Sequence, residues 1–188
     1  ASQDDTYNIV SRITEIDSKR EGNLLLPALP AEVKSSKTDV AIWEKASDIA
    51  AAEIATIKWS EQLAIISICE SLPDQSALFV GSSRPVRDVE AFCHPRSGIE
   101  VFANRGLAGI DGNLSTIFGI AREFQNTYAI LGDLTFLHDI SALTNSASEN
   151  IRIYVIDNNG GAIFSTLPQA GVDNFDQLLG TPHNLDLA

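Results

Sequence analysis

Four short, almost uninterrupted apolar runs constrain the fold more than any other feature of this sequence. They are residues 77–81, 101–104, 128–132 and 151–157. Helical candidates separate them at residues 84–91, 112–124 and 134–147. Strands that are apolar on both faces and alternate with helices form a parallel sheet covered on both sides. We therefore predict an α/β fold, a three-layer sandwich with a mostly parallel sheet flanked by helices.

Each apolar run ends in a polar turn: SSRPVRD, NRGLAGIDG, GDL and DNNGG. The carboxyl ends of parallel strands lie along one edge of a sheet, where ligands of such folds bind. Asp133 follows one strand directly, and Asn158 lies 25 positions further on (158 − 133), after the next strand. Asp133 alone is explained by helix capping. With Asn158 and a backbone carbonyl it forms a set of oxygen donors suited to Mg²⁺ and phosphate.

The remaining polar signals are weaker. Gly106, Gly109 and Gly112 recur at three-residue spacing, which fits a tight loop but neither a dinucleotide fingerprint nor a P-loop. Arg87 and Arg105 lie in two of the polar turns, either as solvated charges or as clamps for carboxylate or phosphate groups.

The histidines and cysteines carry no catalytic pattern. We expect His94 and His183 to be surface or loop residues, and His138 either to face the crevice or to pack. Cys69 and Cys93 have no metal-ligand spacing and are expected to be buried or partly buried free thiols in a reducing compartment.

Charge and hydropathy exclude some classes of partner. The net charge of −12 argues against a surface for nucleic acid or anionic membrane. No apolar run approaches the length of a membrane span, and no leader opens the chain, so we expect a cytoplasmic protein.

The first part of the chain has a different character. Residues 1–37 are polar except for LLLPALP and are predicted to be a tail or linker from a preceding domain. A helical pattern runs with breaks from Thr38 to Glu70, and residues 38–188 are predicted to form one domain. The chain contains no Met, which leads us to expect that it is one part of a longer polypeptide.

Several stretches together resemble a known family. The pairing of GD with NNG about 25 residues apart resembles the signature of thiamine-diphosphate enzymes. VGSSRPVRD, NRGLAGIDG, GDLTFLHD, NNGGAIFSTLPQ and GTPHNLD are similar to the C-terminal, diphosphate-binding domain of the 2-succinyl-5-enolpyruvyl-6-hydroxy-3-cyclohexene-1-carboxylate synthase family, from about Ala77 to Leu187.

The resemblance implies thiamine diphosphate and Mg²⁺ (or Mn²⁺) as cofactors, with a role for each matching position. The implied metal ligands are Asp133, Asn158 and the carbonyl of Gly160. The implied cofactor contacts are Ser83, Gly109, Ile110, Gly132, Asp133, Leu134, Asn158, Gly160 and Ile163. The implied substrate contacts are Arg87, Arg105, Ile163 and Phe164.

The implied reaction is decarboxylation of 2-oxoglutarate and addition of the product to isochorismate, in menaquinone biosynthesis. An activating Glu is expected from the pyrimidine domain of a partner subunit in a homodimer or homotetramer, so this chain alone is expected to be inactive. Three positions depart from the family pattern: Leu134 for Gly, Asp157 for Asn, and Arg84 for an apolar residue. Two alternatives stay open, another thiamine-diphosphate carboligase of the acetolactate synthase kind and a noncatalytic Mg²⁺-phosphate module.

Overall fold

The computed structural model describes residues 40–104, 109–145 and 150–187. Contacts within the chain divide it into two units, Ala1–Ala52 and Glu53–Ala188. Helix α2 (Val40–Ile54) is the described part of the first unit and ends just inside the second. The predicted tail or linker at residues 1–37 lies outside the described residues.

The second unit is built on a four-stranded sheet with the order β2-β1-β3-β4. All described strand pairs are parallel. The strands are β1 (Ser76–Val80), β2 (Ile99–Phe102), β3 (Thr127–Gly132) and β4 (Ile151–Ile156). The four predicted strands are confirmed, each within two residues at either end. In the centre, β1 is buried throughout and β3 is buried up to its last residue, which explains their unbroken apolar sequence.

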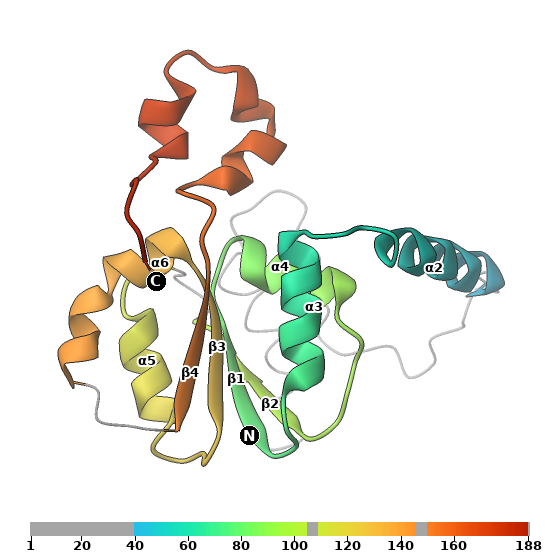
Figure 1. Ribbon diagram of the computed structural model, residues 1–188, viewed down its shortest axis with the longest axis horizontal. Coiled ribbons are helices and arrows are strands. Elements are labelled where there is room, and N and C mark those ends of the chain that lie inside the picture. Colours follow the sequence, from blue (N-terminus) through green and yellow to red (C-terminus); the bar gives the residue numbers. More distant parts are fainter. Residues whose placement is uncertain (1–39, 105–108, 146–149, 188) are drawn as a thin grey trace, which may run out of the picture. The chain divides into compact units, whose positions relative to one another are not determined.

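Helices cover both faces of this sheet, as Figure 1 shows. They are α3 (Glu61–Ser71), α4 (Arg84–Phe92), α5 (Asn113–Ile120), α6 (Asp133–His138) and the 3₁₀ helix η1 (Ile140–Asn145). Alternate strand residues point to opposite faces, so Val80 packs in one cluster with Ile65 of α3. Phe79 packs in the other cluster with Ile117 of α5. The predicted three-layer α/β fold is confirmed. None of the described helices is long and apolar enough to cross a membrane.

Two predicted helices are shorter than expected. The helix predicted at 134–147 stops at His138, because Asp139 leaves the helical conformation (φ −116°, ψ 19°) and its carboxylate accepts the N–H of Ser115 at 3.0 Å. The helix predicted at 112–124 stops at Ile120. After it, the N–H of Arg122 bonds to the carbonyl of Gly119 at 3.2 Å and closes a tight turn.

The strand order reverses between β1 and β3. From β1 the chain continues through α4 to β2 on one side, and from β3 through α6 and η1 to β4 on the other. Such a reversal opens a crevice at the carboxyl ends of the two central strands. The fold therefore places the polar turns after β1, β3 and β4 around one crevice.

Beyond β4 the chain makes an excursion that the sequence did not predict. It leaves the sheet, forms the short helices η2 (Ala162–Thr166), η3 (Pro168–Gly171) and η4 (Asp176–Gly180), and then returns (Figure 1, orange to red). The return is fixed where the N–H of Gly161 donates to the carbonyl of Gly180 at 2.7 Å.

Candidate functional site at the carboxyl edge of the sheet

A cavity of about 300 Å³ lies at the carboxyl ends of β1, β3 and β4. The structure brings most of the predicted site residues together in its lining: Ser83, Ile110, Gly132, Asp133, Leu134, Asn158, Gly160, Ile163 and Phe164. Gly109 and Arg87 are outside this lining, and Arg105 lies outside the described residues. The cavity thus gathers residues from all four polar turns, which are far apart in the sequence.

Asp133 is the best-anchored group in the cavity, with only 2% of the residue exposed. Its Oδ2 accepts the N–H of Gly160 at 2.7 Å and the N–H of Asn158 at 3.3 Å. Its Oδ1 accepts the N–H of Leu134 at 2.7 Å. Each carboxylate oxygen offers about two lone pairs. Oδ2 therefore holds the turn after β4, whereas Oδ1 accepts one N–H group and has a further lone pair for a ligand.

The turn after β4 requires glycine. Gly160 has φ +132°, and a Cβ atom built on it would collide with the backbone carbonyl of Gly180. A Cβ on Gly161 would likewise collide with the carbonyl of Leu179. The two glycines allow the returning segment to lie directly on this turn. Gly160 contributes its N–H to Asp133, and the predicted role of its carbonyl stays a prediction.

His183 contacts the site. It lies in a loop, one of the two placements predicted for it, but it is not the surface residue that the other placement implied. The returning segment carries it to Asp133, with Nε2 3.2 Å from Oδ2, and only 8% of its side chain is exposed. Its Nδ1 accepts the N–H of Leu185 at 3.0 Å. Because Nδ1 accepts, the ring proton lies on Nε2, and His183 donates to the carboxylate.

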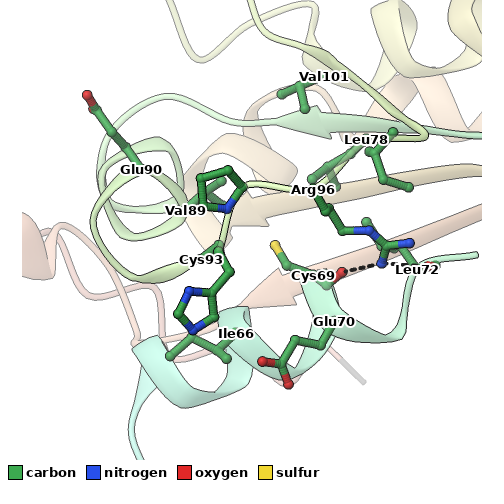
Figure 2. Close-up of a pocket in the computed structure, with 13 residues that line it drawn as sticks. Ile66, Cys69, Glu70, Leu72, Leu78, Val89, Glu90, Cys93, Arg96 and Val101 are labelled. Atoms are coloured by element: carbon green, nitrogen blue, oxygen red, sulfur yellow. Dashed lines mark hydrogen bonds between the residues drawn. The ribbon is translucent and has the colours of Figure 1, made fainter. Parts of the chain in front are cut away.

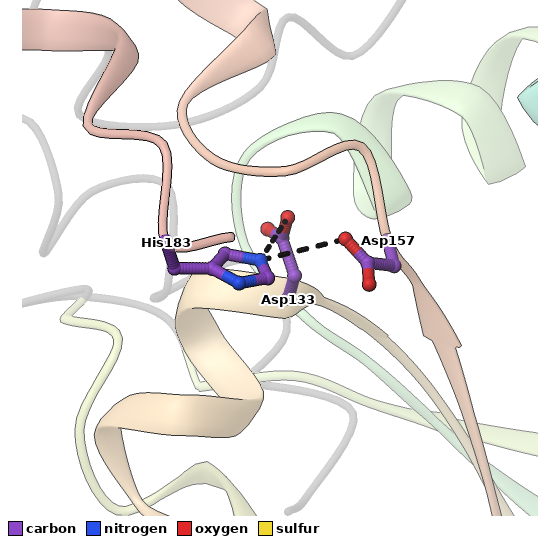
Figure 3. A group of neighbouring side chains, drawn as sticks. All are labelled: Asp133, Asp157 and His183. Atoms are coloured by element: carbon purple, nitrogen blue, oxygen red, sulfur yellow. Dashed lines mark hydrogen bonds and ion pairs between the residues drawn. The ribbon is translucent and has the colours of Figure 1, made fainter. Parts of the chain in front are cut away.

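Asp157 completes a group of three side chains with Asp133 and His183, drawn in Figure 3. Their potential ligand atoms lie within 4.8 Å of one another, a spacing that can hold a metal ion. The Oδ1 of Asp157 is 3.4 Å from Nε2 of His183 and also accepts the N–H of Asn159 at 2.9 Å. With the proton on Nε2, the group is a hydrogen-bonded arrangement around the imidazole, so His183 acts as a donor and not as a metal ligand.

Asn158 shows the clearest sign that the site takes a ligand. Its Nδ2 donates to Oε1 of Glu61 at 3.1 Å. Its Oδ1 is buried and has no hydrogen-bond partner among the described residues. Of the buried, unpartnered side-chain atoms in the described part of the chain, it is the one on a cavity-lining residue. Leaving a buried acceptor unpaired costs about 1–3 kcal/mol, which a cation or donor at this position would relieve. A divalent ion held by oxygen ligands therefore fits this site.

The turn after β1 forms the opposite wall. Ser83 has φ +74° and ψ −126°, a conformation that L-residues rarely adopt and that is typical of functional sites. Its carbonyl accepts Nη1 of the exposed Arg87 at 2.6 Å. Arg84 lines the cavity and pairs with Asp88 at 3.3 Å. Burial raises the pKa of the Asp88 carboxyl, and the neighbouring Arg84 partly offsets this.

A second, larger cavity of about 500 Å³ lies away from these turns, among α3, α4 and the edge strand β2 (Figure 2). Its lining includes Leu78, Val89, Cys69 and Cys93, together with Arg96. Both cysteines are free, as predicted. Burial raises the pKa of the Cys69 thiol and raises that of Cys93 to about 12, so both stay protonated.

The arginine of the second cavity is already paired. The guanidinium of Arg96 donates to the carbonyl of Leu72 at 2.9 Å and to Oδ1 of Asp74 at 2.7 Å, which caps the end of α3. A ligand site needs a few convergent polar groups that are free to bind. The other polar residues of the larger cavity are exposed: Glu70, Glu90 and His94. The smaller cavity instead holds a buried carboxylate and a buried, unpartnered amide oxygen, so it is the better candidate.

The fold and the smaller cavity together define an α/β domain with a candidate ligand site at the switch point of a parallel sheet. Comparison with curated proteins narrows the class. The chain is 44% identical over 122 residues to the 2-succinyl-5-enolpyruvyl-6-hydroxy-3-cyclohexene-1-carboxylate synthase of Thermobifida fusca, covering 61% of this chain and 22% of that protein. It is 40% identical over 156 residues to the synthase of the same name from Lysinibacillus sphaericus, covering 78% and 27%. The synthase of Listeria innocua is 39% identical over 148 residues, covering 76% and 26%.

These matches confirm the resemblance seen in the motifs: over the matched residues the chain is related to this family of synthases. A match that covers 78% of the chain has to include its middle, so Ser83 and Asp133 lie within it. The chain spans about a quarter of the length of the curated relatives it matches. No protein-family model matches it.

Proposed function

We propose that this chain forms the diphosphate- and metal-binding part of a thiamine-diphosphate-dependent synthase. The observation that carries the proposal is the unpartnered Oδ1 of Asn158 beside the anchored carboxylate of Asp133. One amide oxygen and one carboxylate oxygen are a sparse ligand set. Such a set suits Mg²⁺, which keeps several waters and completes its coordination with substrate phosphate oxygens.

In this proposal, Oδ1 of Asp133, Oδ1 of Asn158 and the carbonyl of Gly160 hold Mg²⁺ or Mn²⁺. Ser83 and Ile110, on the other walls of the cavity, contact the cofactor. Thiamine diphosphate, when bound, supplies the electron sink for decarboxylation. The chain's own residues orient it and exclude water, and the apolar side chains of Ile163 and Phe164 shape the space for the substrate.

The proposed reaction follows from the relationship to the synthases. The enzyme decarboxylates 2-oxoglutarate and adds the resulting carbanion equivalent to isochorismate, a step of menaquinone biosynthesis. Arg87 and Arg105 pair with carboxylates of these multiply acidic substrates. For Arg87 this requires a rotation away from the carbonyl of Ser83. The activating Glu comes from the pyrimidine domain of a partner subunit, in a homodimer or homotetramer.

Calorimetry on the complete natural polypeptide tests the proposal. Thiamine diphosphate should bind with micromolar or better affinity when Mg²⁺ is present and at least tenfold more weakly in excess chelator. CO₂ release from 2-oxoglutarate should require both cofactors. Turnover of another 2-oxo acid instead would point to a different carboligase. Binding of Mg²⁺ and inorganic phosphate without affinity for thiamine diphosphate would point to a noncatalytic module.

The same titration on the isolated 188-residue chain separates the contributions of its partners. We expect weak cofactor binding and no turnover, because the activating Glu and half of the cofactor's contacts lie on another domain. Micromolar affinity or measurable turnover in the isolated chain would contradict this part of the proposal.

A further inference from the structure

Two hydrogen bonds hold Asn158, one from its backbone and one from its side chain. The partner of the side chain lies on a helix that is distant in the sequence. The Nδ2 of Asn158 donates to Oε1 of Glu61, 97 positions earlier in the chain, at 3.1 Å. The backbone N–H of Asn158 donates to Asp133 at 3.3 Å. With the backbone and the amide nitrogen both engaged, the amide oxygen is left buried and unpartnered.

From this geometry we infer that Glu61 is a positioning residue, which orients the Asn158 amide so that its oxygen faces the metal. The inference deepens the proposed function and rests on the metal site proposed above. The two ends of an amide have nearly the same shape but opposite chemistry. An ionised carboxylate only accepts hydrogen bonds, so it can pair with the NH₂ end and not with the oxygen. A flipped amide would put two acceptors together at Glu61 and turn N–H groups toward the cation.

The position of Glu61 is itself fixed by the fold. Glu61 is the first residue of α3, and Ser60 caps that helix by accepting the N–H of Leu63 at 3.2 Å. Further along α3, Ile65 is 1% exposed and packs in the same cluster as Val80 of β1. The packed helix therefore holds the carboxylate rigidly beside the turn after β4. Partners that orient metal ligands in this way commonly change metal affinity by 10–100-fold when they are replaced.

The test measures Mn²⁺ binding to the complete polypeptide with thiamine diphosphate, by electron paramagnetic resonance of free and bound Mn²⁺. Glu61→Gln keeps the shape but can pair with either end of the amide, so we expect the dissociation constant of Mn²⁺ to rise about 10–100-fold. Glu70→Gln is the matched control. It removes the same charge from the exposed far end of α3 and should change the constant less than twofold.

A second background separates orientation from simple loss of charge. Asn158→Asp replaces the amide with a carboxylate, whose two oxygens are equivalent and need no orienting. In that background Glu61→Gln should leave Mn²⁺ affinity unchanged or strengthen it, because it removes the repulsion between two carboxylates. If it weakens affinity equally in both backgrounds, Glu61 acts through its charge and the inference is overturned.

The outcomes distinguish this inference from the proposed function. If the unmodified polypeptide binds Mn²⁺ and Glu61→Gln binds it within twofold, the positioning role is wrong and the metal site stands. If the unmodified polypeptide binds no Mn²⁺ with thiamine diphosphate, the proposed site itself fails. Melting temperatures within a few degrees of the unmodified protein show that each variant is folded. If Glu61→Gln does not fold as a single variant, the double variant with Asn158→Asp is compared with the Asn158→Asp variant. Unchanged or stronger Mn²⁺ binding by the double variant supports the inference, and weaker binding overturns it.

Discussion

The two cavities differ in the state of their polar groups more than in their size. The larger one, among α3, α4 and β2, has two protonated thiols, an arginine already bonded to backbone carbonyls, and exposed acidic and histidine side chains at its lining. The smaller one, at the carboxyl edge, has a strained serine, an anchored carboxylate and a buried amide oxygen with no partner. Unpaired or strained polar groups are costly, and native proteins keep them chiefly where they are used.

Under the proposed function, a choice by volume alone would have selected the wrong cavity. A free-energy argument selects the smaller cavity, because among the described residues it is the one whose lining holds a buried side-chain atom without a hydrogen-bond partner. The comparison of the two cavities makes predictions that substitutions can test. Changes at the carboxyl edge should affect ligand binding, and changes in the larger cavity should not.

The largest effect is expected for Asp133→Ala. This substitution removes a proposed metal ligand and leaves the N–H groups of Leu134 and Gly160 without their acceptor. Mn²⁺ and thiamine diphosphate affinity should fall at least a hundredfold, and stability should fall by about 2–4 kcal/mol. Calorimetry and urea unfolding measure both. Asp139→Ala is the control. It also loses a carboxylate that accepts a backbone N–H, but outside the cavity lining, so it should lower stability without changing cofactor affinity.

A smaller, mainly structural effect is expected for Gly160→Ala. The added methyl group meets the carbonyl of Gly180 at a positive φ, so the turn and the returning segment must separate. We expect a loss of about 2–3 kcal/mol together with weaker cofactor binding. Gly119→Ala is the matched control, because a Cβ on Gly119 of α5 meets nothing within 4 Å. It should stabilise the protein by about 0.5–1 kcal/mol. Equal unfolding midpoints for the two variants would contradict the close approach at Gly160.

His183→Ala should have an intermediate effect on binding and a modest one on stability. It removes a buried donor to Asp133, so we expect about tenfold weaker Mn²⁺ binding and a loss of about 1–2 kcal/mol. His94→Ala serves as the control, because His94 is exposed and lines the larger cavity. If His183→Ala abolishes Mn²⁺ binding while Asp133→Asn does not, His183 is a metal ligand and the assignment of its Nε2 proton is wrong.

The smallest effect on function is expected from the thiols. Burial raises the pKa of Cys93 from 9.0 to about 12, so at pH 8 the folded protein holds roughly a thousandfold less thiolate than an ordinary cysteine. Alkylation by iodoacetamide should be at least about a hundredfold slower in the folded protein than in urea. Cys93→Ala should leave cofactor affinity unchanged. Rapid alkylation of the folded protein at pH 8 would contradict the burial of this thiol.

The same thiol predicts the direction of a pH effect on stability. Between pH 9 and about 12 the unfolded chain loses the Cys93 proton while the folded chain keeps it. The folded state then binds more protons, so the free energy of unfolding falls as the pH rises through this window. Cys93→Ala should lessen the fall in urea-unfolding experiments. A free energy of unfolding that rises over this range would show the sign to be wrong.

The sequence was sufficient for the parts of the fold that local patterns determine. Apolar runs buried on both faces located β1 and β3, and the polar turns after them located Asp133 and Asn158. It did not reveal Glu61 and His183, because their contacts to Asn158 and Asp133 join residues 97 and 50 positions apart. Neither residue stands in a local pattern that indicates its partner. The Gly160–Gly161 pair is a local signal that could have indicated the close approach of another backbone, which the structure shows.

Crystals of the complete polypeptide grown with thiamine diphosphate and Mn²⁺ test the central claim most directly, through the anomalous scattering of manganese. We predict a single manganese peak at the carboxyl edge, within coordination distance (about 2 Å) of Oδ1 of Asp133 and Oδ1 of Asn158, with a diphosphate oxygen on its open side. A manganese peak between Asp157 and His183 with Asn158 unbound, or the cofactor in the cavity beside Cys69 and Cys93, would contradict the account.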